Sequence, residues 1–443
     1  MNKSGIQTAN KVLYTRYKSA ASKVFIYKPQ DKSFGYLLIC FLLWPFGAFL
    51  YALYNYTHKE SRIILVLFTA LYGYSMIAES EGMDLSRYLD TLKNFIDLSV
   101  LDFYNEIFAT YSGKSDSSSS DLYVNVVAFL VSRFTISGSV LMMVFGLVYG
   151  YVYSKGLSIL LTFNRLKNQY TIILLICFSF ILGLDQLAGV RFGTSAYLFF
   201  AGAMKWLQNK DKISWLYILS AVFVHFGLMP GVLLLIIYPF IGKNEKIIYG
   251  LTLLSFFIPN LLHNYMLQYS SLFQGGISNK VHTYTKTGLM DEYSASWNQV
   301  SWFIKYRYDA IMTYSYFALS FIIYKSKHLT ITLFSKRLLL FALLILIFRN
   351  FTMSIPELGS RYQFIYLMFV MGYLYHLYST NKSKTEIKYL AYGAIAASIL
   401  QIVFVLRIFI NYTPVSLFYG NLIMIFANND TQSLWAFIQS IMN

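Results

Sequence analysis

Hydrophobic residues occur in long runs along this chain, and shorter polar segments separate one run from the next. A helix rises about 1.5 Å per residue, so roughly 20 apolar residues cross the ~30 Å hydrocarbon core of a bilayer. The pattern predicts an all-α, polytopic integral membrane protein with about 11–12 transmembrane helices. We expect these helices within 34–56, 61–78, 123–154, 169–184, 188–207, 212–227, 229–241, 246–267, 306–325, 337–352, 362–379 and 387–410.

Two of these regions do not fit a single straight span. The run 123–154 is too long for one helix, so we expect 121–135, which contains Arg133, to lie along the interface before the span begins. The run 229–241 is short and follows Pro230, and proline interrupts helices because it lacks an N–H group. The sixth and seventh spans are therefore predicted to form a broken or partial pair.

The composition agrees with a membrane protein. Hydrophobic residues fill 57% of the 443 positions, charged residues fill only 13%, and the mean hydropathy is +0.51. A soluble domain is about one quarter charged. Cys40 and Cys177 both lie inside apolar runs, so the sequence predicts neither a disulfide framework nor a zinc site.

The net charge of +16 comes from lysine and arginine in the short loops, a distribution that orients a membrane protein and implies no nucleic-acid partner. Cytoplasmic loops carry this excess of basic residues. The opposite set of loops contains the long segments 79–121 and 268–305, which we expect to face outward. The basic loops contain Lys59, Arg62, Lys155, Arg165, Lys167, Lys205, Lys210, Lys212, Lys243, Lys246, Lys325, Lys327, Lys336, Arg337, Lys382, Lys384 and Lys388.

The basic N-terminal arm, residues 1–33, conflicts with this orientation. Its charges favour the cytoplasm, whereas a complete first span entering the basic loop at 58–62 would place the arm outside. Either 34–56 is a re-entrant hairpin bent near Pro45, or the arm is an amphipathic segment on the outer leaflet. No internal repeat divides the chain, so 34–410 is predicted to form one membrane domain, followed by an outer or interfacial tail at 411–443.

Polar residues at the predicted outer ends of the runs form the candidate site, because charge near the bilayer is costly and marks function. Helical spacing places Asp84 beside Arg87 and Tyr88, which fits either a binding site or a local ion pair. Arg191 heads an apolar helix, where it either binds an anion or reaches the lipid headgroups. Arg307, at the outer start of a later run, is a further substrate-binding candidate.

Two later segments complete the set. A lone histidine such as His225 is usually neutral and hydrogen-bonded, although a nearby phosphate would favour its cation and a nearby hydroxyl would suit a base. Ser354 and Glu357 match a capping box at a helix start, which favours a structural role for Glu357. Arg361 and Tyr362 at the mouth of a span are the stronger candidates for binding.

These residues resemble the EpsG family, which is grouped with the Wzy-type O-antigen and capsular polysaccharide polymerases of bacteria. The resemblance covers about residues 34–380. It rests on Asp84 followed by Tyr88, on Arg191 and His225, and on the Arg361–Tyr362 pair. The chain departs from the family by having Met83 where a glycine usually precedes the aspartate, and by its N-terminal arm. The resemblance implies an integral membrane glycosyltransferase of GT-C-like architecture, with an active site that opens to the outer face of the bacterial cytoplasmic membrane.

The implied reaction is polymerisation of undecaprenyl-diphosphate-linked oligosaccharide units, which act as both donor and acceptor. Nucleotide sugars are absent outside the cytoplasm, so the donor is lipid-linked. Arginine can pair its diphosphate bidentately, and a carboxylate or imidazole can take the acceptor proton. We expect Asp84 to be the base and His225 a phosphate or acceptor contact, with no cofactor and no metal. The predicted catalytic residues are Asp84, Arg191, His225 and Arg361, and the predicted substrate-binding residues are Arg87, Tyr88, Arg307, Glu357 and Tyr362.

Other functions fit part of the pattern. Ligation of a glycan to a lipid or protein acceptor uses the same chemistry, whereas a transporter or flippase of lipid-linked oligosaccharide has a similar number of spans. Transporters often contain repeats and place polar groups at the bilayer midplane, which this sequence does not indicate. Expected partners are membrane lipid, a flippase and a chain-length regulator.

Overall fold

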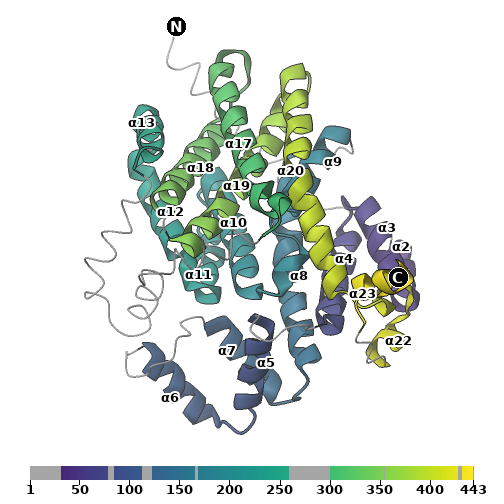
Figure 1. The fold of residues 1–443 in the computed structure, drawn as a ribbon. Coiled ribbons are helices and arrows are strands. Elements are labelled where there is room, and N and C mark those ends of the chain that lie inside the picture. Colours follow the sequence, from purple (N-terminus) through teal and green to yellow (C-terminus); the bar gives the residue numbers. More distant parts are fainter. Residues whose placement is uncertain are drawn as a thin grey trace.

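The computed structural model describes residues 31–77, 84–111, 122–164, 168–258, 300–353, 355–427 and 432–442. Helices form the architecture of these residues, and their one isolated β-bridge joins Pro414 to Ser433. The all-α prediction is confirmed (Figure 1). Three of the described helical segments are long and apolar enough to cross a membrane, namely Gly138–Phe163, Gln169–Leu187 and Thr385–Tyr412.

The long helices follow the predicted runs closely and pack side by side in a bundle (Figure 1). Apolar runs predict helices well here because each buries its side chains against neighbours or lipid. The bundle helices are α4 (Lys59–Ser75), α8 (Gly138–Phe163), α9 (Gln169–Ser179), α10 (Val190–Asn209), α13 (Glu245–Ser255), α17 (Trp302–Tyr324), α18 (Leu333–Phe351), α19 (Pro356–Thr380) and α20 (Thr385–Tyr412).

Helix α19 occupies the centre of the bundle. It packs against α8, α9, α10, α17, α18 and α20. Its tyrosine and phenylalanine rings interlock with those of its neighbours; for example, Phe369 lies 5.1 Å from Phe341 and 5.2 Å from Phe200 between ring centroids. The buried side chains of α19 include Tyr362, Ile365, Tyr366, Leu367, Met368, Phe369, Val370, Met371, Tyr373, Leu374, Tyr375, Leu377 and Tyr378.

Helices α4 and α8 approach each other more closely than side chains would allow. A Cβ added to Gly146 would lie 2.4 Å from the carbonyl oxygen of Thr69, and one added to Gly73 would lie 2.3 Å from that of Met142. Small residues let membrane helices bring their backbones together in this way, and the contact is then driven by van der Waals packing.

Two of the predicted runs are divided into separate helices at the positions that the sequence predicts. The first run divides at Trp44 into α2 (Asp31–Leu43) and α3 (Pro45–Tyr54), and Pro45 is the first residue of the second helix. The overlong run divides into α7 (Leu122–Ser132) and α8. The run 169–184 is shorter as a helix than expected, because α9 ends at Ser179 and the 3₁₀ turn η1 (Leu184–Leu187) follows.

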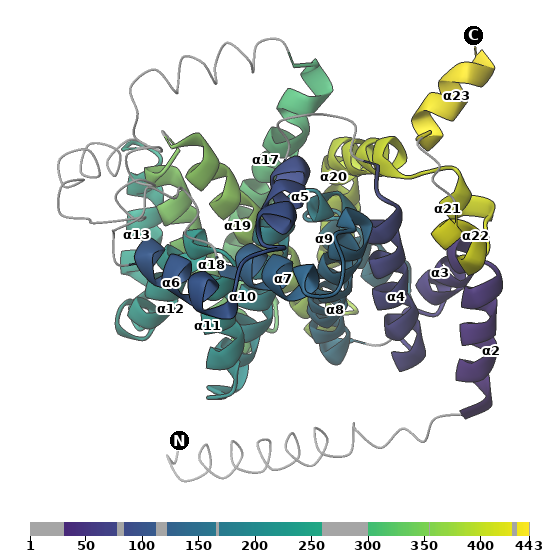
Figure 2. The ribbon, with the colours of Figure 1, turned by 90° about the horizontal axis from the view of Figure 1, so that it is seen from below.

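The helices α5 (Asp84–Asn94), α6 (Val100–Tyr111) and α7 lie across one end of the bundle (Figure 2). The guanidinium of Arg133, which follows α7, donates to the carbonyls of Leu98 at 2.9 Å and Ile96 at 3.0 Å and so fixes the chain after α5. At the C-terminus, α21 (Ser416–Tyr419), α22 (Leu422–Ala427) and α23 (Leu434–Met442) pack against α3, α2 and α20 respectively.

Candidate functional site

The first turn of α10 brings several predicted site residues together. The Arg191 guanidinium carbon lies 5.8 Å from the centroid of the Tyr88 ring on α5, a cation–π distance. Tyr88 is buried and contacts Phe145 of α8 edge-on, with ring centroids 5.6 Å apart. The structure therefore joins Arg191 to the α5 segment, as the sequence predicts, whereas Arg87 on the same helix is exposed to solvent.

Part of the predicted site lies outside the described residues. Helix α5 begins at Asp84. The side chain of Asp84 and the whole of Met83 lie outside the described part of the structure. The segments 79–121 and 268–305, which the sequence predicts to face outward, are described only in part, over 84–111 and from 300 onward. The role of Asp84 as a base remains a prediction.

His225 lies at the turn between two short helices, α11 (Ser214–Val224) and α12 (Met229–Ile241), with the 3₁₀ turn η2 (Phe226–Leu228) between them. The 11 residues of α11 rise about 16 Å, roughly half the hydrocarbon core, so the predicted partial pair is present. The His225 ring is buried and meets the edge of Phe192, the residue after Arg191, at 6.1 Å between centroids. His225 and Arg191 are thus neighbours through α10.

Tyr362 holds this turn in place. Its ring is fully buried on α19, and its hydroxyl accepts a hydrogen bond from the Gly231 N–H at 2.6 Å and donates to the Gly227 carbonyl at 3.2 Å. Gly231 is in the first turn of α12, where N–H groups have no acceptor within the helix, so the hydroxyl caps α12. This position differs from the predicted substrate contact: Tyr362 positions the His225 turn and its ring has no exposed face.

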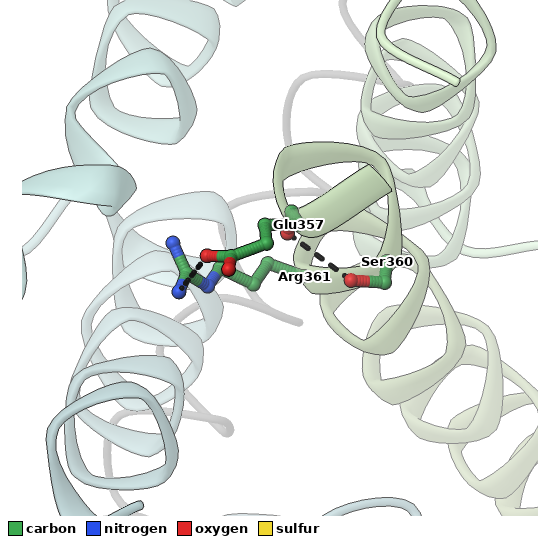
Figure 3. A network of polar contacts seen from close by, with 3 residues as sticks. All are labelled: Glu357, Ser360 and Arg361. Carbon is green, nitrogen blue, oxygen red and sulfur yellow. Dashed lines mark hydrogen bonds and ion pairs between the residues drawn. The ribbon is translucent and has the colours of Figure 1, made fainter. Parts of the chain in front are cut away.

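Arg361 and Glu357 form an ion pair one turn apart on α19, with 2.9 Å between Nη2 and Oε2 (Figure 3). Ser354, the serine of the predicted capping box, lies outside the described residues. The N-cap of α19 is Ile355, which makes no side-chain cap, and Pro356 starts the helix with a preset φ and no N–H to satisfy. The Glu357 side chain is 61% exposed, so the pair adds little stability, about 0.3–0.5 kcal/mol.

Arg361 belongs to the same end of the bundle as Arg191. Phe364 lies three residues later and so on the same face of α19, and its ring is 5.9 Å from that of Phe192. Tyr308 of α17 meets Phe364 edge-on at 5.0 Å, which brings the neighbouring Arg307 to this region. Segments from α5, α17 and α19 and the turn after α11 therefore lie near the first turn of α10.

Sequence reasoning missed Asp185, which lies in η1 shortly before α10 and interacts electrostatically with Arg307. The available signal was a carboxylate in an apolar stretch, where charge is costly and usually functional. Within the described residues, no group of three or more His, Cys, Asp or Glu side chains is placed to hold a metal ion.

No family model, curated protein or solved structure matches this chain. The site combines cationic groups at the start of one helix, a buried histidine at a helix break, and aromatic rings that link them.

Proposed function

We propose that this protein is a membrane glycosyltransferase that polymerises undecaprenyl-diphosphate-linked oligosaccharide units at the outer face of the bacterial cytoplasmic membrane. The observation that carries the proposal is the convergence of Tyr88, Arg191, His225 and Arg361 on one end of the bundle from four separate parts of the chain. A common ligand would give these side chains a shared role. The polytopic GT-C-like architecture and the outward orientation are part of this proposal.

Arg191 and Arg361 bind the diphosphate of the donor. A guanidinium pairs two phosphate oxygens at once, and the charge that develops on the leaving diphosphate strengthens these bonds in the transition state. Tyr88 stacks against the Arg191 guanidinium and limits its rotation. His225, whose ring contacts Phe192 next to Arg191, binds the same phosphate or the acceptor sugar in this proposal.

The test is elongation by purified protein in liposomes that contain an undecaprenyl-diphosphate-linked repeat unit. The wild type should produce a ladder of products. Arg191→Lys should reduce elongation by about 10–100-fold, because losing one charge-assisted hydrogen bond costs about 1.5–3 kcal/mol. Arg361→Lys should behave similarly.

The matched control is Arg337→Lys at the opposite end of α10, where Arg337 donates to the Leu207 carbonyl at 3.1 Å. This variant should elongate within about twofold of the wild type, since no substrate contact is lost there. Full activity of both Arg191→Lys and Arg361→Lys would contradict the diphosphate assignment. Movement of a fluorescent lipid-linked sugar across the bilayer, without a product ladder, would instead identify a flippase.

A further inference from the structure

The turn that carries Asp185 is fixed from three sides. It joins α9 to α10, and loops between helices are ordinarily mobile. Here buried side chains from α8, α10 and α20 donate hydrogen bonds to backbone carbonyls within residues 180–183, which lead directly into η1. The bonds are Tyr149 Oη to Gly183 O at 2.6 Å, Tyr197 Oη to Leu182 O at 2.9 Å and Gln401 Nε2 to Phe180 O at 3.0 Å.

The Asp185 carboxylate is only partly satisfied. Its Oδ2 accepts a hydrogen bond from Gln186 Nε2 at 2.9 Å, whereas Oδ1 is buried without a hydrogen-bond partner among the described residues. Gly183 makes room for it: a Cβ there would lie 2.9 Å from Oδ1 and 2.7 Å from Val405 Cγ1. A buried carboxylate oxygen without a donor is costly, so a rigid turn that retains one indicates a waiting ligand.

Arg307 on α17 interacts electrostatically with this carboxylate, and aromatic rings hold its side chain in place. Its guanidinium carbon lies 3.4 Å from the ring centroid of Phe404 on α20 and 4.4 Å from that of Tyr308. The side chain is buried, and its Nε and Nη1 have no hydrogen-bond partner within the described part of the chain. Gln401 Oε1, one turn before Phe404, is also buried and receives no hydrogen bond from any described residue. Acceptor atoms of Asp185 and Gln401 and donor atoms of Arg307 are thus buried without hydrogen-bond partners among the described residues, and each type could serve a ligand hydroxyl.

This centre adjoins the candidate site. Gln186 packs against the start of α10, because a Cβ on Gly193 would lie 2.9 Å from the Gln186 Cβ. On the other side, the Tyr308 ring contacts Phe364, which contacts Phe192 beside Arg191. Asp185 and Arg307 thus flank the helix end that holds the proposed diphosphate-binding arginine.

We propose that Asp185 is the catalytic base that accepts the proton of the acceptor sugar, and that Arg307 orients the same hydroxyl. The proposal rests on the transferase function above. The hydroxyl proton passes to Asp185 Oδ1 as the hydroxyl oxygen bonds to C1 of the donor sugar. The bond between C1 and the diphosphate oxygen breaks, and its electron pair leaves with the diphosphate.

The groups that face Asp185 do not compete for this role. One is the cation Arg307, and the others are tyrosine hydroxyls, which are far weaker acids than a carboxylic acid. They come from α4, α8, α10 and α17, namely Tyr72, Tyr149, Tyr153, Tyr197, Arg307 and Tyr308. The sequence predicts Asp84 as the base, so Asp84 is the alternative carboxylate for this role.

The experiment measures single-turnover elongation by Asp185→Asn in the liposome assay. The turnover rate should fall by about 10²–10⁴-fold, the usual contribution of a general base. The half-saturating concentration of lipid-linked acceptor should change less than about threefold. A base acts only when deprotonated, so the wild-type rate should fall toward acidic pH and the residual Asp185→Asn rate should not. Asp211→Asn, at the opposite end of α10, should match the wild type.

Several results would overturn the assignment. Asp185→Asn with a turnover rate within threefold of the wild type would do so, as would a loss of acceptor binding that accounts for the whole effect. An inactive Asp84→Asn beside an active Asp185→Asn would move the base to Asp84. If Asp185→Asn fails to fold in detergent, Asp185→Glu takes its place: because it keeps a carboxylate, its rate should still fall toward acidic pH, and a Glu variant whose rate shows no acidic fall would refute the role. A wild type without any ladder would instead refute the proposed function itself.

Discussion

Replacing Tyr362 by phenylalanine tests whether one hydroxyl holds the His225 turn. The change removes the cap on the Gly231 N–H and the bond to the Gly227 carbonyl, both in a fully buried site. Each buried hydrogen bond contributes about 1 kcal/mol net, and an N–H left without a partner costs up to about 3 kcal/mol. Tyr362→Phe should therefore lower the free energy of unfolding by about 2–3 kcal/mol.

The assay is denaturation by SDS in mixed micelles, followed by circular dichroism, with the midpoint converted to a free energy. Tyr373→Phe is the matched control: Tyr373 is fully buried on the same helix, and its hydroxyl has no hydrogen-bond partner in the described structure. That variant should be neutral or slightly stabilised. A difference below about 0.5 kcal/mol between the two variants would refute the capping role, because both lose the same atom from similar surroundings.

Two further predictions concern packing and topology. Gly146→Ala should destabilise the protein by about 1–3 kcal/mol, because its Cβ would press on the Thr69 carbonyl. Gly250→Ala, whose Cβ would meet no atom within 4 Å, should not destabilise it in the same SDS assay. Equal stability of the two variants would contradict the close α4–α8 contact. Cysteines introduced at Ser117 and Ser278 should react with an impermeant maleimide in intact spheroplasts, and labelling only after permeabilisation would reverse the orientation inferred from the basic loops.

The helices could be predicted because long apolar runs identify them and proline marks their breaks. Pro45 and Pro230 both fall at the start of a helix in the structure, as their missing N–H groups require. In the structure Arg191 contacts Tyr88, and Phe192 beside it contacts His225, whereas the side of the membrane that these residues face stays a prediction from the basic loops. Most helices and helix breaks could be predicted because each depends on the residues of a single segment.

What escaped prediction depends on pairs distant in the chain. Tyr362 meets Gly231 across 131 positions, and no local pattern distinguishes a tyrosine that caps another helix from one that stacks on a sugar. Asp185 was overlooked because its importance comes from Arg307 on α17, which packs beside it only in the folded bundle.

The buried position of α19 has a consequence for biogenesis. Its 25 residues include Arg361, Glu357 and a series of tyrosines, and it is not among the helices apolar enough to cross a membrane by themselves. Inside the bundle it meets protein on nearly every side. We therefore expect α19 to leave the translocon slowly and to stay beside α18. It should enter the bilayer only after earlier helices have inserted and can pack against it. Insertion of this protein is then a cooperative event near the end of synthesis, and damage to α8, α10 or α18 should appear first as a topology defect in the C-terminal third of the chain.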